Sequence, residues 1–373
     1  MIQRAVRTFV ALVLLGVTLA PATPALAGQR DVGGKRSFST FTQNAYVGAQ
    51  IGRVLSLNPS DPAYFQKLVG AVTITYYELL ASLPEVRMAG IAERIASREP
   101  DLVALQEVSL LRKQSPGDLV SGAPDQVPAT EVVADFLQIL LDELAARGEH
   151  YAVVAMTTEM DVEMPMVNQL SGEFDDVRLT DREVILARTD LPPGYLKVSN
   201  PQSGNFANHI VIPSIDLPVL RGWCSVDVFV RGRKFRFINA HLEEETQPVL
   251  QWLQALELLQ GPSNTSLPVV LAGDFNSDGN RANGTFTYDG LLDAGFSDPW
   301  TALHPLDPGL TWGHDPLLAD PTWPLVWRID FALYRGNQFL PQGATVVDDS
   351  LGRAVPPYWP SDHAGVAVKL RLK

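Results

Sequence analysis

The chain has 373 residues, of which 46% are apolar, and a formal charge of −13 at pH 7. This length and apolar content suffice for a large buried core in one large or two ordinary domains. The acidic surface repels polyanions in general, although a few Arg and Lys side chains with divalent ions could still bind nucleic acid locally. The one cysteine, Cys224, excludes an intrachain disulfide, and its apolar neighbours favour a buried thiol over a nucleophile.

Residues 1–27 have the pattern of a secretory signal peptide. Arg4 and Arg7 precede an apolar stretch that is shorter than the roughly 20 residues needed to span a bilayer, and an Ala-Leu-Ala motif ends the segment. We therefore expect cleavage before Gly28, a secreted or periplasmic location, and a mature chain of 346 residues with a charge of −15 and no integral membrane span. The alternative is an uncleaved amphipathic anchor.

Helix and strand signals are mingled along the rest of the chain. Helical apolar spacing covers 61–83, 85–98, 130–147 and 247–260. Pro84 opens the second of these helices, while Thr130 is the expected cap and Gly148 the expected end of the third. Strand signals cover 151–155, 183–188, 226–230, 234–239, 329–334 and 364–372. The pattern, with a hairpin across 231–233, predicts a mixed α/β sheet system.

The segments 115–128 and 304–324 are expected to be long surface loops, which in compact domains are usually functional or mobile. No linker rich in Gly, Ser or Pro divides the chain, and no internal repeat is present. We therefore expect residues 28–373 to form a single domain.

Polar side chains follow several apolar runs. Asp274 and Asn276 come after the run 269–273, and positions i and i+2 of a strand share a face, so a carboxylate and an amide would point into one site that handles water or a metal. Each such residue alone has a structural alternative, such as a solvated turn. Their recurrence favours a joint site. The other polar residues beside apolar runs are Asn44, Glu107, His241 and Ser361-Asp362-His363.

Six motifs stand in an order that is typical of one family: Asn44, Gln106-Glu107, His241, Gly273-Asp274-Phe275-Asn276, Arg328-Ile329-Asp330 and Ser361-Asp362-His363. This set, which covers about residues 38–372, resembles the endonuclease/exonuclease/phosphatase superfamily. That superfamily includes deoxyribonuclease-I-like nucleases, neutral sphingomyelinases and inositol-polyphosphate phosphatases. The resemblance implies an α/β fold, a four-layer α/β/β/α sandwich of two mixed sheets flanked by helices, with the active site at one edge.

The resemblance also implies a divalent cation, Mg²⁺ or alternatively Mn²⁺, which prefers hard oxygen ligands. Glu107 is the expected primary ligand, with Asn44 beside it and Asp362 joining through water. Zinc is disfavoured because the chain has no cluster of Cys ligands and no His-x-x-x-His helix.

The remaining motif residues have implied catalytic roles. Asp274 orients or deprotonates the attacking water, and Asn276 helps to hold the phosphate. His363 binds a phosphoryl oxygen, while Asp330 locks its tautomer and favours its imidazolium form. His241 is a second histidine on the phosphate side, which stabilises charge or assists the leaving oxygen.

Two positions bear on the choice of substrate. Arg182 resembles the phosphate-binding arginine of deoxyribonuclease-I-like enzymes, and the alternative is a surface ion pair with Asp181 or Glu183. Ser109 stands where those enzymes carry a basic residue that reaches into the minor groove, and their structural disulfide is absent, which weakens duplex-specific recognition.

Four tryptophans could form a stacking or lipid-facing wall or could anchor the core and the loops: Trp312, Trp323, Trp327 and Trp359.

Other catalytic classes lack their motifs, because no Gly-x-Ser-x-Gly elbow occurs and Gly33-Gly34-Lys35 is followed by Arg36 rather than by Ser or Thr. We expect an exported, Mg²⁺-dependent phosphoesterase that prefers diesters to monoesters and acts as a monomer on nucleic acid or on a phospholipid head group. One alternative is a sphingomyelinase- or phosphoinositide-type lipid phosphohydrolase acting at membranes. An alternative of another class is a binding or toxin-like partner protein that keeps the scaffold with little activity.

Overall fold

The computed structural model describes residues 36–121, 126–212 and 217–373. The predicted leader lies outside these residues, so its cleavage stays a prediction. The helices are α1 (Gly52–Leu55), α2 (Tyr64–Ala81), α3 (Pro84–Arg98), α4 (Phe136–Ala146), α5 (Pro248–Gln260), α6 (Thr287–Asp293) and α7 (Pro299–Leu303). The strands are β1 (Ser37–Asn44), β2 (Leu102–Gln106), β3 (Leu110–Gln114), β4 (Glu131–Asp135), β5 (Tyr151–Val167), β6 (Phe174–Arg188), β7 (Leu196–Asn205), β8 (Ile210–Ile212), β9 (Leu217–Val219), β10 (Gly222–Val230), β11 (Arg233–His241), β12 (Val269–Asp274), β13 (Asp330–Arg335), β14 (Phe339–Val347) and β15 (Gly365–Leu372).

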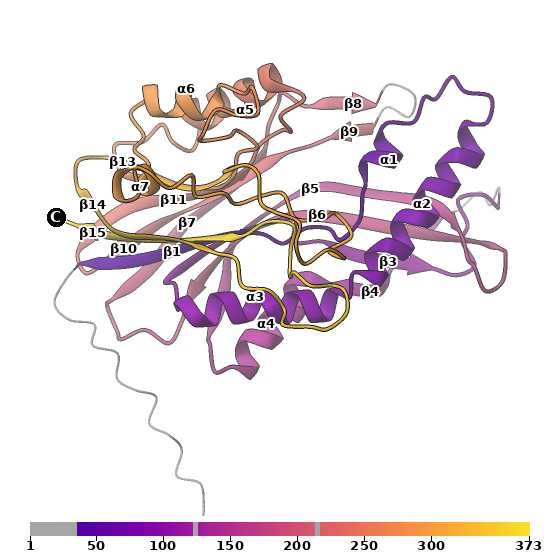
Figure 1. The fold of residues 1–373 in the computed structure, drawn as a ribbon, viewed down its shortest axis with the longest axis horizontal. Helices are drawn as coiled ribbons and strands as arrows, with labels where there is room; N and C mark the ends of the chain where they lie inside the picture. Colours follow the sequence, from indigo (N-terminus) through magenta and orange to yellow (C-terminus); the bar gives the residue numbers. More distant parts are fainter. Residues whose placement is uncertain (1–35, 122–125, 213–216) are drawn as a thin grey trace, which may run out of the picture. The chain divides into compact units, whose positions relative to one another are not determined.

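Most of the strands belong to two large mixed sheets (Figure 1). The first has the order β14-β15-β1-β2-β6-β3-β4, with β5 also paired to β6, and the second has the order β13-β12-β11-β10-β7. The pairs β1/β2 and β11/β12 are parallel, while their other neighbours are antiparallel. Each parallel pair brings two carboxyl ends of strands to the same edge of its sheet.

Alternation along the strands produces the layers. In β12, Val270 and Ala272 pack in the core between the two sheets, whereas Val269 and Leu271 pack with Ala255 of α5 and with α6. The outer face of the first sheet is covered in the same way by α2, α3 and α4. Because side chains of a strand point to opposite faces in turn, these fully apolar strands are buried on both sides. The predicted sandwich of two mixed sheets flanked by helices is confirmed.

The predicted helix at 130–147 is wrong in its first part. Residues 131–135 form β4, which pairs with β3, and the helix α4 begins only at Phe136. Asp135 is the cap, because its carboxylate accepts hydrogen bonds from the backbone N–H groups of Leu137 and Gln138. Thr130 therefore does not cap this helix.

The strand signals at 151–155 and 183–188 mark only parts of β5 and β6, which are 17 and 15 residues long. The hairpin across 231–233 is confirmed, since β10 and β11 pair on either side of a turn in which Arg231 and Gly232 have positive φ. None of the described helices combines the length and the apolar character that crossing a membrane requires.

Candidate active site

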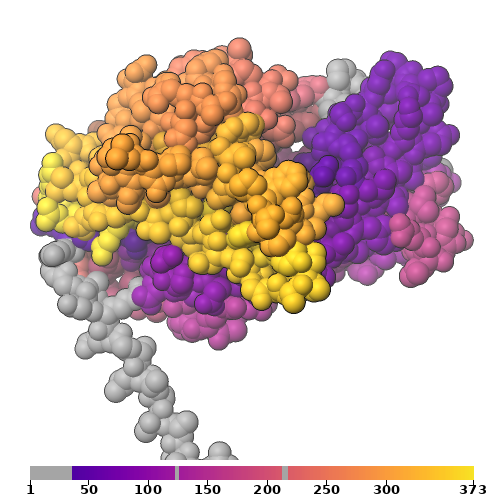
Figure 2. Space-filling model, viewed as in Figure 1, coloured from indigo at the N-terminus to yellow at the C-terminus, as the bar shows by residue number. Residues whose placement is uncertain are grey.

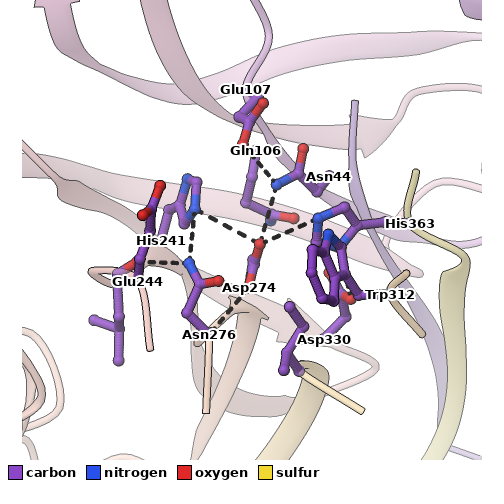
Figure 3. Close-up of polar contacts among 12 residues, drawn as sticks. Asn44, Gln106, Glu107, His241, Glu244, Asp274, Asn276, Trp312, Asp330 and His363 are labelled. Carbon is purple, nitrogen blue, oxygen red and sulfur yellow. Dashed lines mark hydrogen bonds and ion pairs between the residues drawn. The ribbon is translucent and has the colours of Figure 1, made fainter. Parts of the chain in front are cut away.

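Strand ends from both sheets bring the predicted residues together. In the first sheet Asn44, at the end of β1, is the register partner of Gln106 at the end of β2. In the second sheet His241 and Asp274 are partners at the ends of β11 and β12, and Asp330 at the start of β13 faces Asp274. Figure 3 shows Asp274 between His241 and His363. The pairing pattern therefore gathers residues that are far apart in the sequence.

Unusual backbone conformations shape the site. Glu107 and Asn276 have φ of 53° and 50°, a region that side chains other than glycine rarely adopt. Gly273 has φ of 142°, and a Cβ atom there would lie 1.9 Å from the backbone oxygen of Ala240. Only glycine lets β12 approach β11 this closely and deliver Asp274 beside His241.

Asp274 is held by two amides. Its Oδ1 accepts a hydrogen bond from the backbone N–H of Asn276 at 2.9 Å, and its Oδ2 accepts one from Asn44 Nδ2 at 3.0 Å. Burial raises the pKa of Asp274 to about 7, and the charge of Asp330 adds to this rise, while His363 and the hydrogen bonds oppose it. The carboxyl group is therefore poised to exchange a proton near neutral pH.

His363 forms the cationic side of the site. Its Nδ1 lies 2.9 Å from Asp330 Oδ2, and its Nε2 lies 3.7 Å from Asp274 Oδ2. Burial alone would lower the pKa of His363, but the carboxylates of Asp330, Asp362 and Asp274 outweigh burial and raise the pKa to about 10. His363 is thus an imidazolium at neutral pH, as the sequence analysis expects.

His241 has the opposite electrostatic surroundings. Its Nε2 lies 3.6 Å from Asp274 Oδ2, and Arg221 Nη1 lies 3.1 Å from each of its ring nitrogens. Burial lowers the pKa of His241 well below its ordinary value, and the positive charges of Arg221 and His363 lower it further. Asn276 Nδ2, 3.3 Å from Nε2, donates to this neutral ring.

Two buried glutamates lie behind His241. Glu183 Oε1 is 3.4 Å and Glu159 Oε2 is 3.9 Å from its Nδ1, and neither of these oxygens has a hydrogen-bond partner among the described residues. Burial raises the pKa of both glutamates well above the ordinary value, and neighbouring carboxylates such as Asp181 raise it further. Arg221 opposes this rise, so it is the main positive charge of this cluster.

The residues predicted to bind metal supply hard oxygen atoms. Glu107 Oε2 accepts from the backbone N–H of Val47 at 2.9 Å, and Oε1 accepts from Asn44 Nδ2 at 3.1 Å. Asp362 Oδ2 accepts from Trp312 Nε1 at 3.3 Å, while Oδ1 makes no hydrogen bond within the described residues and lies 3.9 Å from His363 Nε2. Burial raises the pKa of Asp362 to about 6, and the charge of Glu107 contributes to the rise. Two carboxylates that line one cavity, one of them with an oxygen that makes no hydrogen bond within the described residues, fit a divalent cation.

Asn44 has a different geometry from the one expected of a ligand. Its Oδ1 accepts a hydrogen bond from the backbone N–H of Tyr46 at 2.8 Å, so its Nδ2 points toward Glu107 and Asp274. In this arrangement Asn44 fixes the relative positions of the two carboxylates by donating to both.

The structure does not bring Arg182 to the other site residues. Its guanidinium donates to the backbone oxygens of Val108 and Ser109 and pairs with Asp135, the cap of α4. Neighbouring residues of a strand point to opposite faces, so Asp181 lines the cavity and Arg182 does not. The arginine at the site is Arg221, which the sequence analysis missed. It directly precedes β10, beside Gly222, the register partner of His241.

These side chains surround a catalytic cavity of about 310 Å³. It is lined by Tyr46, Val47, Ala49, Gln50, Ile51, Gly52, Glu107, Ser109, Met160, Leu179, Asp181, Arg221, His241, Glu244, Glu245, Asp274, Asn276, Trp312, Pro316, Asp362 and His363. Of the four tryptophans only Trp312 is in this lining, and its ring is stacked on Trp327 at 4.8 Å. Trp359 instead stacks on His314, which anchors its loop.

Solved structures with the same fold cover most of the chain. An endonuclease/exonuclease/phosphatase family protein from Leptotrichia buccalis is 14% identical with a TM-score of 0.53, and the match covers 89% of this chain and 99% of that protein. A mannosyl-6-phosphatase from Bacteroides thetaiotaomicron is 17% identical with a TM-score of 0.52, and the coverage is the same. A further family protein from that organism is 16% identical with a TM-score of 0.53, covering 90% of this chain and 98% of its own.

The sequence comparisons add the family. No curated protein matches the chain at a significant level. A family model described as "Endonuclease/Exonuclease/phosphatase family" matches residues 81–363, which include every predicted site residue except Asn44. The chain belongs to the endonuclease/exonuclease/phosphatase family.

Proposed function

We propose that this chain is a divalent-metal-dependent phosphoesterase that hydrolyses phosphodiesters in preference to monoesters. The observation that carries the proposal is the position of Asp274 between a cationic and a neutral histidine, with a pKa of about 7. A carboxylate with this pKa is half ionised near neutral pH, so it can take a proton from water and release it again.

In the proposed reaction a water molecule bound by Asp274 attacks phosphorus. The oxygen of the water forms a new bond to phosphorus, its proton passes to Asp274 Oδ2, and the bond between phosphorus and the alcohol oxygen breaks. The released alkoxide takes a proton from a solvent water, and the hydroxide left behind takes the proton from Asp274. Asn276 N–H and Asn44 Nδ2 keep the carboxylate in place during this step. Positioning of this kind removes much of the entropic part of the barrier.

Cationic groups stabilise the additional charge on the phosphoryl oxygens. The imidazolium of His363 binds one non-bridging oxygen, and Asp330 fixes the orientation of that ring. Arg221 lines the cavity beside His241 and supplies guanidinium donors for the phosphate. His241, held neutral, lines the cavity on the same side.

The two carboxylates of Glu107 and Asp362 are the proposed ligands of Mg²⁺ or Mn²⁺. Both line the catalytic cavity, and Oδ1 of Asp362, which makes no hydrogen bond within the described residues, is a donor atom for a hard cation. The chemistry that such an ion supplies is neutralisation of charge on the phosphoryl oxygens.

The test is a hydrolysis assay on the purified mature chain, with and without Mg²⁺ or Mn²⁺. The primary substrate is bis-p-nitrophenyl phosphate, followed by DNA, RNA, sphingomyelin and phosphoinositides. Sugar phosphates join the panel because one similar structure is named mannosyl-6-phosphatase. We expect metal-dependent hydrolysis of the diester. Lack of hydrolysis across the whole panel in the presence of either ion would refute the proposal and favour a binding protein that keeps the scaffold.

Export and a monomeric state also belong to the proposal. The support is the charge pattern and Ala-x-Ala site within residues 1–27. Mass spectrometry of the protein recovered outside the cytoplasm should show an N-terminus at Gly28, and light scattering should give the mass of one chain. An intact N-terminus in a membrane fraction would instead support the uncleaved anchor.

A further inference from the structure

A second pocket, of about 80 Å³, is lined by hydrophobic side chains from α1, α2, β3, β5 and β6 and from the start of β9. Its lining residues are Ile51, Val54, Leu55, Val72, Thr75, Tyr76, Leu79, Leu111, Met160, Val162, Met164, Val177, Leu179 and Leu217. Among the described residues, no charged side chain takes part in this lining. We call it the apolar pocket.

The apolar pocket and the catalytic cavity share a wall. Ile51, Met160 and Leu179 line both. Along β6, alternate residues Val177, Leu179 and Asp181 share one face, so the lining changes from apolar to acidic within one strand. The apolar pocket therefore adjoins the catalytic cavity.

The outer wall of the pocket comes from α1 and α2. Figure 1 shows these helices beside β5 and β6, and Figure 2 shows their surface in indigo along one flank, beside the orange and yellow surface of segments after residue 300. Both helices lie within residues 52–81, whereas the family match starts at residue 81. The outer wall of the apolar pocket is therefore formed almost entirely by residues that precede the region matched by the family model.

We infer that the apolar pocket holds an aliphatic ester group of the substrate, one that stays on phosphorus during hydrolysis, so that the substrates are amphiphilic phosphodiesters. This inference rests on the proposed phosphoesterase function. In the catalytic cavity, Arg221, His363 and the carboxylates proposed to bind metal can interact with a phosphate. The adjoining apolar pocket has few groups that can form hydrogen bonds with water. Transfer of methylene groups from water to such a pocket is favourable, so it increases the reactivity of long-chain esters over short ones.

The experiment is a homologous series of 4-nitrophenyl alkyl phosphodiesters, from methyl to octyl, each used below its micelle concentration. We expect kcat/KM to rise by about fourfold for each of the first methylenes and then to level off once the chain outgrows the pocket. The nitrophenolate leaving group stays the same, so differences within the series report the alkyl group.

Variants locate the effect. Val54→Trp and Met164→Trp place a large ring in the apolar pocket from α1 and from β5, and both residues lie outside the lining of the catalytic cavity. We expect each variant to flatten the chain-length series while hydrolysis of the methyl ester stays at the wild-type rate. Ile74→Trp is the matched control, because Ile74 is 52% exposed on α2 next to Thr75 and lines neither site. It should keep the wild-type series.

The outcomes separate this inference from the function on which it rests. If the methyl ester is hydrolysed and the series is flat, the apolar pocket has no role in substrate binding and the phosphoesterase stands. If no member is hydrolysed, the proposed function fails. Calorimetric titration with methylphosphonate and hexylphosphonate then tests the apolar pocket alone. Tighter binding of hexylphosphonate would support the inferred role of the pocket, and equal affinities would overturn it.

Discussion

The two histidines of the site occupy similar positions and carry different charges. Both rings are buried, and the Nε2 atoms of His241 and His363 lie 3.6 and 3.7 Å from the same oxygen of Asp274. His363 is hydrogen-bonded to Asp330 and faces further carboxylates, whereas His241 has Arg221 against both ring nitrogens. Burial favours the neutral form of both rings, so the difference in their charge comes from their neighbours: carboxylates outweigh burial at His363, whereas Arg221 adds to its effect at His241.

The largest expected effect comes from the group between the two histidines. Asp274→Asn removes the proton acceptor and should lower kcat/KM for bis-p-nitrophenyl phosphate by roughly 10³-fold. Circular dichroism should remain that of the wild type, because Asn keeps the size of the side chain. Asp293→Asn, an exposed change at the end of α6, is the control. Wild-type turnover in Asp274→Asn would contradict its role as the base.

The next effect tests the cationic histidine by its pH dependence. In the wild type, kcat/KM should rise through about pH 7 as Asp274 loses its proton and fall toward pH 10 as His363 loses its own. Asp330→Asn removes a carboxylate that raises the pKa of His363, so the alkaline limb should move to lower pH. Activity at neutral pH should drop by roughly 10²-fold. If the alkaline limb of the profile does not move in Asp330→Asn, the loss of activity at high pH does not come from deprotonation of His363.

A smaller effect separates the two arginines. Arg221→Met removes the charge beside His241 and should lower kcat/KM by roughly 10- to 100-fold, with most of the loss in KM. Arg182→Met should leave kcat/KM unchanged and lower the thermal midpoint, because Arg182 does not line the cavity and binds the backbone of Val108 and Ser109 and the side chain of Asp135. Steady-state kinetics and thermal denaturation of both variants make the comparison. If Arg182→Met lowers kcat/KM and Arg221→Met does not, Arg182 is the phosphate-binding arginine instead.

The smallest effect concerns the carboxyl groups behind the neutral histidine. Burial raises the pKa of Glu183 well above its ordinary value and so favours the protonated form, for which Gln is a close replacement. Glu183→Gln should change kcat/KM by less than about threefold, in contrast to Asp330→Asn. A loss as large as that of Asp330→Asn would mean that His241 also depends on an ionised partner.

Much of the site follows from the sequence because catalytic side chains stand where apolar runs end. Asn44, Glu107, His241 and Asp274 each follow such a run, and strand pairing brings the ends together. The layers of the fold follow from the same apolar strands. These signals are local, so a single sequence reveals them.

The remainder depends on contacts between distant segments. Arg221 stands before β10 without an apolar run ahead of it, and its place beside His241 arises from the pairing of β10 with β11. The orientation of Arg182 depends on Asp135, which also decides where α4 begins. The sequence predicts helix at 131–135 because Val133 also fits a helical repeat, whereas the pairing with β3 makes this segment a strand.

The stacked pair of Trp312 and Trp327 makes the proposed metal ligand Asp362 visible to spectroscopy. Their rings are 4.8 Å apart at 19°, and the indole N–H of Trp312 donates to Asp362. Excitations of two indoles at this separation are coupled, and the charge state of the carboxylate perturbs one of them. Titration of the protein with Mg²⁺ should therefore change its near-ultraviolet circular dichroism, which gives a readout of ion binding without any substrate.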